Sequence, residues 1–205
     1  ALEIKQLGAS KPKGEKGRAE FMVSGSSMNK LVLDSNSIKL VGSGTLNPAM
    51  DDIKTLKITT LEAGGNKLTA DVEKDDGYKV TFSADSFNAV PIIEGMGKSE
   101  PEKDSVKIKL SGNVKKMLFY HDQSLNNVKL NITCATDCDN VDLSSSDLSI
   151  SQTPEHMSIS SDNAGKILKM LDAYEDMEGG KLKVEAKGIG KGGYQGKAVI
   201  EDFTL

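Results

Sequence analysis

Apolar side chains occupy every second position over most of this chain. The segment SVKIKLSGNV places Val106, Ile108 and Leu110 on one side and lysine or serine on the other. The segments NVKLNITC and LKVEAKG repeat the arrangement over residues 128–134 and 182–186. Because successive side chains of a strand point to opposite faces, this period of two predicts strands with one apolar and one polar face. We therefore expect a mainly β protein.

Turn signals separate the alternating segments in the first half of the chain. SGSSMN lies between EFMVSG and KLVLDS, and the Asp-Gly pair of KDDG lies between NKLTADVEK and YKVTFSAD. Both arrangements predict β-hairpins. DDIKTLKITTLEAG could form a helix by composition, but the spacing of Leu56, Ile58 and Thr60 favours a strand. The polar stretch at residues 96–104 is a candidate sub-boundary within a single unit of residues 1–205.

Two segments depart from the alternation and predict helices. In the last quarter, apolar residues recur at three- and four-residue spacing, which gives one apolar stripe. The stripe consists of Ala164, Ile167, Leu168, Leu171 and Tyr174. The Ser-Ser-Asp run at residues 160–162 offers N-cap side chains, and Gly179-Gly180 is expected to end this amphipathic helix. Earlier in the chain, Pro91 predicts a short helix that begins at that residue.

The last quarter also carries a series of motifs that span about 45 residues. The series reads (D/N)-A-G-x-x-L, then G-G-x-L, then Y-x-G-x-x-x-(I/L)-x-(D/N)-F. The matching residues are Asp162, Asn163, Ala164, Gly165, Leu168, Gly179, Gly180, Leu182, Tyr194, Gly196, Ile200, Asp202 and Phe203. In this series the chain resembles the C-terminal domain of the AsmA-like envelope proteins of Gram-negative bacteria, relatives of TamB. Upstream, TFSADSFNAVPIIEG is similar to the strand followed by a short helix that recurs in that family.

The resemblance implies a long curved antiparallel sheet with one amphipathic helix near the C-terminus and one short helix in mid-chain. It also implies a periplasmic segment of a longer protein, whose anchor in the inner membrane lies outside this sequence. Neighbouring segments of that chain and phospholipid acyl chains are the implied partners. The implied function is phospholipid transport between the inner and outer membranes and outer-membrane biogenesis, with acyl chains held on a concave apolar face.

Candidate site residues follow from combining this resemblance with the alternation. The expected lining residues are Ile108, Leu110, Leu130, Ile132, Leu182 and Val184. The helix stripe of Ile167, Leu168 and Leu171 is expected to pack on the strands that contain Leu182 and Val184, as a plug or end cap.

A second interpretation fits the same alternation. Two sheets could pack their apolar faces together in a closed β-sandwich, which would be a non-catalytic structural or adhesion module of the cell envelope. Alternation alone does not separate an open groove from a sandwich. The formal net charge of −4 comes from mixed charges without a basic cluster, so no nucleic-acid partner is expected. No apolar run approaches the length that would span a bilayer.

The two cysteines offer three alternatives. Cys134 and Cys138 lie between two predicted strands, so they could face each other across a turn and form a disulfide. An exported protein favours that bond over free thiols. A metal site is the least favoured alternative, because there is no second cysteine pair and the nearby aspartates make a poor calcium loop.

Other chemical motifs are weak. Gly188, Gly190 and Gly193 satisfy G-x-G-x-x-G, but predicted strands flank them on both sides, which favours a hairpin turn over a dinucleotide site. His121 and His156 have no metal-ligand spacing, and no serine lies in a G-x-S-x-G motif. We therefore expect no enzyme activity, no cofactor and no metal.

Overall fold

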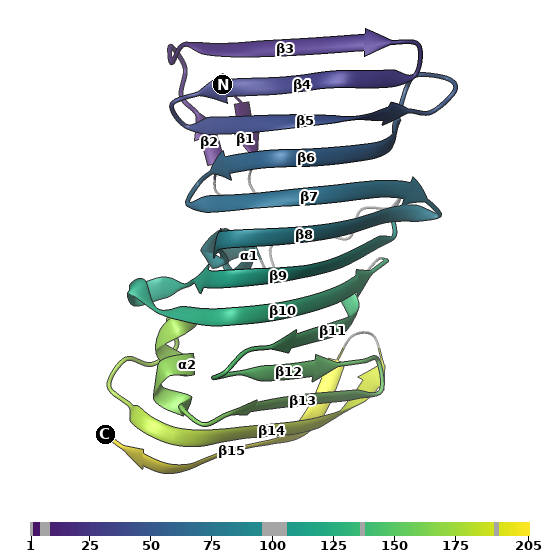
Figure 1. Cartoon of the computed structure of the whole chain (residues 1–205). Helices are drawn as coiled ribbons and strands as arrows, with labels where there is room; N and C mark the ends of the chain where they lie inside the picture. Colours follow the sequence, from purple (N-terminus) through teal and green to yellow (C-terminus); the bar gives the residue numbers. More distant parts are fainter. Residues whose placement is uncertain (1, 5–8, 96–105, 136–137, 191–192) are drawn as a thin grey trace.

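Thirteen strands pair side by side in one open sheet (Figure 1). The computed structural model describes residues 2–4, 9–95, 106–135, 138–190 and 193–205. Neighbours in the sheet follow chain order from β3 to β15, and the sheet bends most clearly at β14 and β15 (Figure 1). The predicted mainly β fold, with a long sheet, one helix near the C-terminus and one short helix in mid-chain, is confirmed, and the sheet is open.

The sheet elements have the following bounds. The large sheet contains β3 (Gly17–Ser24), β4 (Ser27–Ser35), β5 (Ile38–Leu46), β6 (Ile53–Ala63), β7 (Asn66–Asp75), β8 (Gly77–Asn88), β9 (Ile108–Leu118), β10 (Ser124–Cys134), β11 (Cys138–Ser144), β12 (Ser149–Gln152), β13 (His156–Ser161), β14 (Glu178–Gly190) and β15 (Gly193–Thr204). A separate two-stranded sheet pairs β1 (Leu2–Ile4) with β2 (Ala9–Lys11). The helices are α1 (Val90–Gly95), the 3-10 helix η2 (Tyr120–Asp122) and α2 (Ala164–Met170).

The pairing of β8 with β9 differs from the antiparallel pattern expected throughout. These two strands are parallel, with Tyr78 opposite Ile108 and Asn88 opposite Leu118. A parallel pair needs a crossover connection instead of a tight turn, and the segment that contains α1 supplies it. The candidate sub-boundary at residues 96–104 lies outside the described residues, but the strands on either side of it belong to the same sheet.

The short helix α1 starts one residue before the predicted position. Its first residue is Val90, whose backbone N–H donates to the Asn88 side-chain oxygen over 3.1 Å. Pro91 is then the second residue, where the missing N–H costs no helical hydrogen bond. Ile93 packs against the main core cluster.

The helix α2 is shorter than the predicted helix, and its caps differ. Asn163 is the N-cap, since its side chain accepts from the Lys166 backbone N–H over 3.0 Å. Asp172 ends the helix with a φ of 56°, and the backbone N–H groups of Asp172 and Ala173 return to Lys169 and Leu168. This arrangement is a Schellman motif closed by an aspartate.

The early end of α2 overturns two sequence predictions. Leu171 falls at the C-cap and is 46 % exposed, so it is not part of the packed stripe. Gly179 and Gly180 do not end the helix; both lie in β14, with φ values of 66° and 83°. Met170, one residue earlier than Leu171, takes the buried position and is only 1 % exposed.

The main core lies where α1 and α2 pack on the sheet. It is a cluster of buried residues from β7 to β10, α2 and the turn before β12. The most deeply buried side chains are Leu125 and Val128 of β10, Val114 of β9 and Met170 of α2. Burial at this level contributes about 1.5–3 kcal/mol for each large side chain, so this cluster fixes α2 against the second half of the sheet.

Candidate functional site

One residue from each of the thirteen strands forms a continuous apolar ladder across the sheet. Directly paired residues point to the same face, so the pairing register identifies the members. In strand order they are Phe21, Leu31, Gly42, Ile58, Ala70, Phe82, Gly112, Leu130, Leu143, Ile150, Ile159, Val184 and Ala198. Strands lie about 4.8 Å apart, so this ladder extends over roughly 58 Å.

A second row runs beside the first on the same face. Its members are Val23, Met28, Gly44, Leu56, Val72, Val80, Leu110, Ile132, Val141, Gln152, Met157, Ala186 and Gly196. Gln152 is the only polar residue in either row. We call these two rows together the apolar face. The two rows are apolar except at Gln152 because the register repeats, since a slip by one residue would place polar side chains in them.

The opposite face of the sheet carries a continuous polar row from β5 to β15. It reads Ser43, Lys57, Asp71, Thr81, Ser111, Asn131, Asp142, Ser151, Ser158, Glu185 and Lys197. Over these eleven strands this row lies opposite the apolar face, as expected for a sheet with one solvated face.

Many side chains of the apolar face are half-buried. Leu143, Ile150, Ile159 and Val184 fall in this class on four successive strands, and Ile58 does so in the first half of the sheet. Every described strand except β1 and β2 belongs to the large sheet, so no second layer of comparable size closes over this face. The closed sandwich is therefore not the architecture of the described residues.

The helix α2 covers part of the apolar face. Its buried residues Ile167 and Met170 belong to the same cluster as Leu148 and Val128, and Leu182 of β14 packs against that cluster. The predicted contact between the helix and the strand of Leu182 is therefore present. It is made by Ile167 and Met170; Leu168 is half-buried and Leu171 is exposed.

The predicted lining residues all lie on one side of the sheet. Ile132 pairs with Leu110, and Leu130 pairs with Gly112. Val184 is a member of the same ladder as Leu130. Leu182 lies two residues before Val184 in β14, so its side chain points to the same face. Leu110 and Ile132 are half-buried, whereas Leu130 is only 7 % exposed. Leu130 therefore belongs to the core and offers little surface to a ligand.

Ile108 stands at the edge of this surface. It begins β9, opposite Tyr78 and Cys134, and is 41 % exposed. The sequence predicts a strand over residues 106–110, but its first residue, Val106, lies outside β9 and is 50 % exposed. The sequence prediction thus placed the start of this strand two residues too early.

The sequence prediction omitted several members of the apolar face. Ile58, Phe82, Leu143, Ile150 and Ile159 occur in strands whose alternation was visible, but their membership depends on which strands are neighbours. Strand order in the large sheet follows the chain. Alternation combined with that simple order would have identified most of the ladder.

A hollow of about 510 Å³ lies over β6 to β10 on the polar face. From β7 to β10 its lining includes Thr69, Ser83, Asn113 and Lys129, each of which is next to a ladder residue in the chain and points to the opposite face. Lys115 and Asp85, which also line it, form an ion pair of 2.7 Å. The hydrogen bond from Lys115 lowers the pKa of Asp85 and raises the pKa of Lys115.

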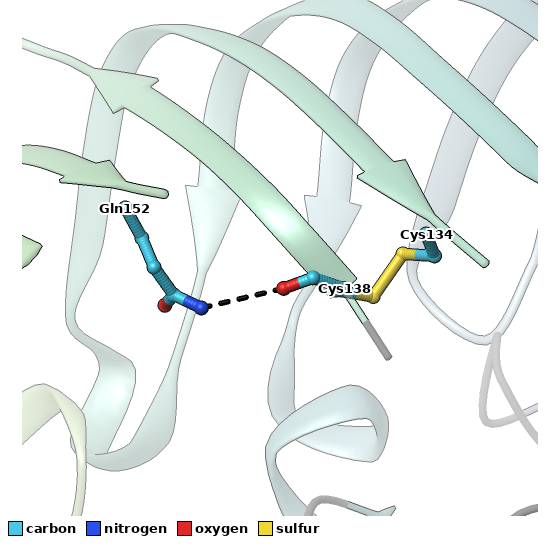
Figure 2. The surroundings of a disulfide bond; sticks show 3 residues. All are labelled: Cys134, Cys138 and Gln152. Carbon is cyan, nitrogen blue, oxygen red and sulfur yellow. Dashed lines mark hydrogen bonds between the residues drawn. A yellow bond between two sulfur atoms is a disulfide. The ribbon is translucent and has the colours of Figure 1, made fainter. Parts of the chain in front are cut away.

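Cys134, the last residue of β10, and Cys138, the first residue of β11, form a disulfide at the end where the chain connects these two strands (Figure 2). Their Cα atoms are 3.8 Å apart, and the two residues are partners in the pairing of these strands. The Gln152 side chain donates to the Cys138 carbonyl oxygen over 3.3 Å, which ties β12 to the same end (Figure 2).

Comparisons with known proteins identify no relative: no family model, no curated protein and no solved structure matches this chain. None of the described helices is long and apolar enough to cross a membrane. In the described part of the chain, every buried side-chain nitrogen or oxygen has a hydrogen-bond partner. The feature that distinguishes this molecule is therefore the apolar face.

Proposed function

We propose that the chain is a segment of an AsmA-like periplasmic protein that holds phospholipid acyl chains on its apolar face. The observation that carries the proposal is the unbroken ladder of apolar side chains and glycines across all thirteen strands. A monomer rarely leaves an apolar patch larger than a few hundred Å² in contact with water, and larger ones mark interaction sites. Acyl chains suit such a surface, because apolar burial is non-directional and scales with area.

The polarity of the two faces supports a lipid over a polar ligand. Leu110, Ile132 and Ile150 offer aliphatic carbon and no hydrogen-bonding group. The lipid head groups would remain at the rim of the face, so no dedicated phosphate site is needed. Anchoring in the inner membrane and a role in lipid transport to the outer membrane belong to the same proposal, and the anchor would lie in another part of the parent protein.

Neighbouring segments of the parent protein are proposed partners at the β3 edge. Among the described strands β3 pairs only with β4, and it exposes Phe21, Met22 and Val23 by 61 %, 54 % and 48 %. A strand added beside β3 would satisfy its free backbone groups and cover Phe21, the first member of the ladder. The apolar face would then continue into the next segment.

Photo-crosslinking in cells tests the lipid proposal. A benzophenone residue at Leu110 or Ile132 should capture phospholipid. Matched controls at Ser111 and Asn131 place the same probe one residue away on the polar face, and they should give no lipid adduct. Repeated absence of lipid adducts from folded Leu110 and Ile132 variants would contradict the proposal. Protein adducts at those positions would favour the alternative, a structural or adhesion module whose apolar face is covered by a partner.

A further inference from the structure

Three side chains that could bind a cation converge beside α2. The His121 Nε2 atom lies 2.6 Å from Asp172 Oδ1 and 3.4 Å from Glu175 Oε1, and the three atoms all lie within 4.8 Å of one another. His121 belongs to η2 in the turn between β9 and β10, whereas Asp172 and Glu175 follow α2. The fold therefore joins segments that are 51 residues apart, which sequence spacing could not reveal.

The two carboxylates have no other cationic partner. Among the described ion pairs, Asp172 and Glu175 contact only His121, and neither pairs with a lysine or arginine. Two carboxylates and one imidazole therefore meet here without a lysine or arginine.

The backbone positions of two ligands are set by the surrounding structure. Asp172 closes the Schellman motif of α2. Met170, two residues earlier, is buried in the core with 1 % exposure and holds this end of the helix in place. On the other side, Gln123 donates from its backbone N–H to the Tyr120 carbonyl oxygen and from its side chain to the His121 carbonyl oxygen. Ligands held in this way lose less conformational entropy when they bind an ion.

We propose that His121, Asp172 and Glu175 form a site for a divalent transition-metal cation of the Zn²⁺ class. One imidazole nitrogen and two carboxylate oxygens are ligands that Zn²⁺ accepts, at about 2.0–2.2 Å. Two ligands at that distance from a tetrahedral ion lie roughly 3.4 Å apart. The His121–Glu175 separation already matches this value, and the His121–Asp172 contact needs to open by less than 1 Å.

The bound ion connects α2 to the turn between β9 and β10. All three ligands are exposed, so water completes the coordination and the ion can enter directly from solvent. The sequence spacing around His121 did not indicate these contacts with Asp172 and Glu175. It is independent of the proposed lipid function, because none of its residues belongs to the apolar face.

Calorimetric titration of the oxidised, untagged chain with ZnCl₂ tests the site. The Cys134–Cys138 disulfide must stay intact, since free thiols would bind zinc themselves. We expect one equivalent of Zn²⁺ to bind and the melting temperature to rise. His121→Gln, Asp172→Asn and Glu175→Gln should each weaken binding by at least about tenfold. Asparagine tolerates the positive φ of Asp172, so that variant keeps the helix end.

The other histidine of the chain supplies the matched control. His156 lies 3.0 Å from Glu185 and has no second carboxylate within ion-pair distance among the described residues. His156→Gln should therefore bind Zn²⁺ like the unmodified chain. The absence of any heat or melting shift at millimolar Zn²⁺ would overturn the proposal. Equal binding by all variants, or loss of binding only in His156→Gln, would overturn it as well.

Discussion

The aromatic ring of Phe82 lies over Gly112, its partner in the parallel pairing of β8 and β9. A Cβ atom built on Gly112 would stand 2.3 Å from Phe82 Cε1, closer than any allowed contact. Phe82 is 6 % exposed and belongs to the main core cluster. The glycine therefore provides the space that the ring occupies, at the centre of the apolar ladder.

Gly112→Ala should destabilise the protein, although alanine is the smallest possible addition. The ring of Phe82 must move off a well-packed position, which costs about 1–3 kcal/mol in a core. Urea denaturation of the purified chain measures the loss. Gly112→Ala should cost much less in a Phe82→Ala background, where the ring is absent. Additive losses in this double-mutant cycle would show that the ring and the glycine do not interact.

Two adjacent residues of α2 should respond very differently to the same change. Met170→Asp places a carboxylate in the core and should lower the free energy of unfolding by about 3 kcal/mol or more. Leu171→Asp should cost less than about 1 kcal/mol, because Leu171 is 46 % exposed. Thermal denaturation of both variants compares them. A larger loss from Leu171→Asp would restore the helix stripe that the sequence predicts.

The difference between these two residues also shows what sequence patterns could establish. The apolar period placed a helix after residue 163 and identified Ile167 correctly. It did not reveal the end of α2, because Asp172 adopts a positive φ that only a minority of aspartates take. Because Leu171 is the C-cap residue, Met170 takes the buried position in its place.

The sheet was predictable in character but not in its pairing. Alternation at Leu110 or Ile132 depends only on adjacent residues, so it could be identified from sequence alone. The ladder from Phe21 to Ala198 depends on strand order and register, and the parallel step at β8 and β9 depends on a crossover. The contact between His121 and Asp172 is harder still, since it needs the packed positions of α2 and η2.

The disulfide should protect both cysteines from thiol reagents but contribute little stability. Protein purified without reductant should show no mass-tagged thiol after denaturation. The bridge joins residues separated by four positions, and so small a loop restricts the unfolded chain only slightly. Reduction should therefore shift the melting temperature by no more than a few degrees. Two tagged thiols in the unreduced protein would rule out the bond.

The ion pair between Asp147 and Lys166 should make the attachment of α2 dependent on pH. Asp147 lies in the turn between β11 and β12, and the hydrogen bond from Lys166 of α2 lowers the pKa of its carboxyl group. A carboxyl whose pKa is lowered by folding stabilises the folded state above its unfolded pKa of about 3.9. That contribution is lost as the pH falls through the lower folded pKa.

Asp147→Asn removes this contribution at every pH. The difference in stability between the variant and the unmodified chain should therefore depend on pH. At pH 7 the variant should be less stable than the unmodified chain by up to about 1 kcal/mol, since both side chains are partly exposed. The difference should shrink towards zero as the pH falls below the unfolded pKa of about 3.9 and through the lower folded pKa, because the unmodified carboxyl is then also protonated. Asp71→Asn is the matched control, because Asp71 has no ion pair among the described residues. Urea denaturation of the three proteins from pH 7 to pH 2.5 measures both differences. If the loss caused by Asp147→Asn stayed constant over this range, the carboxylate charge would not be what holds α2 to the turn.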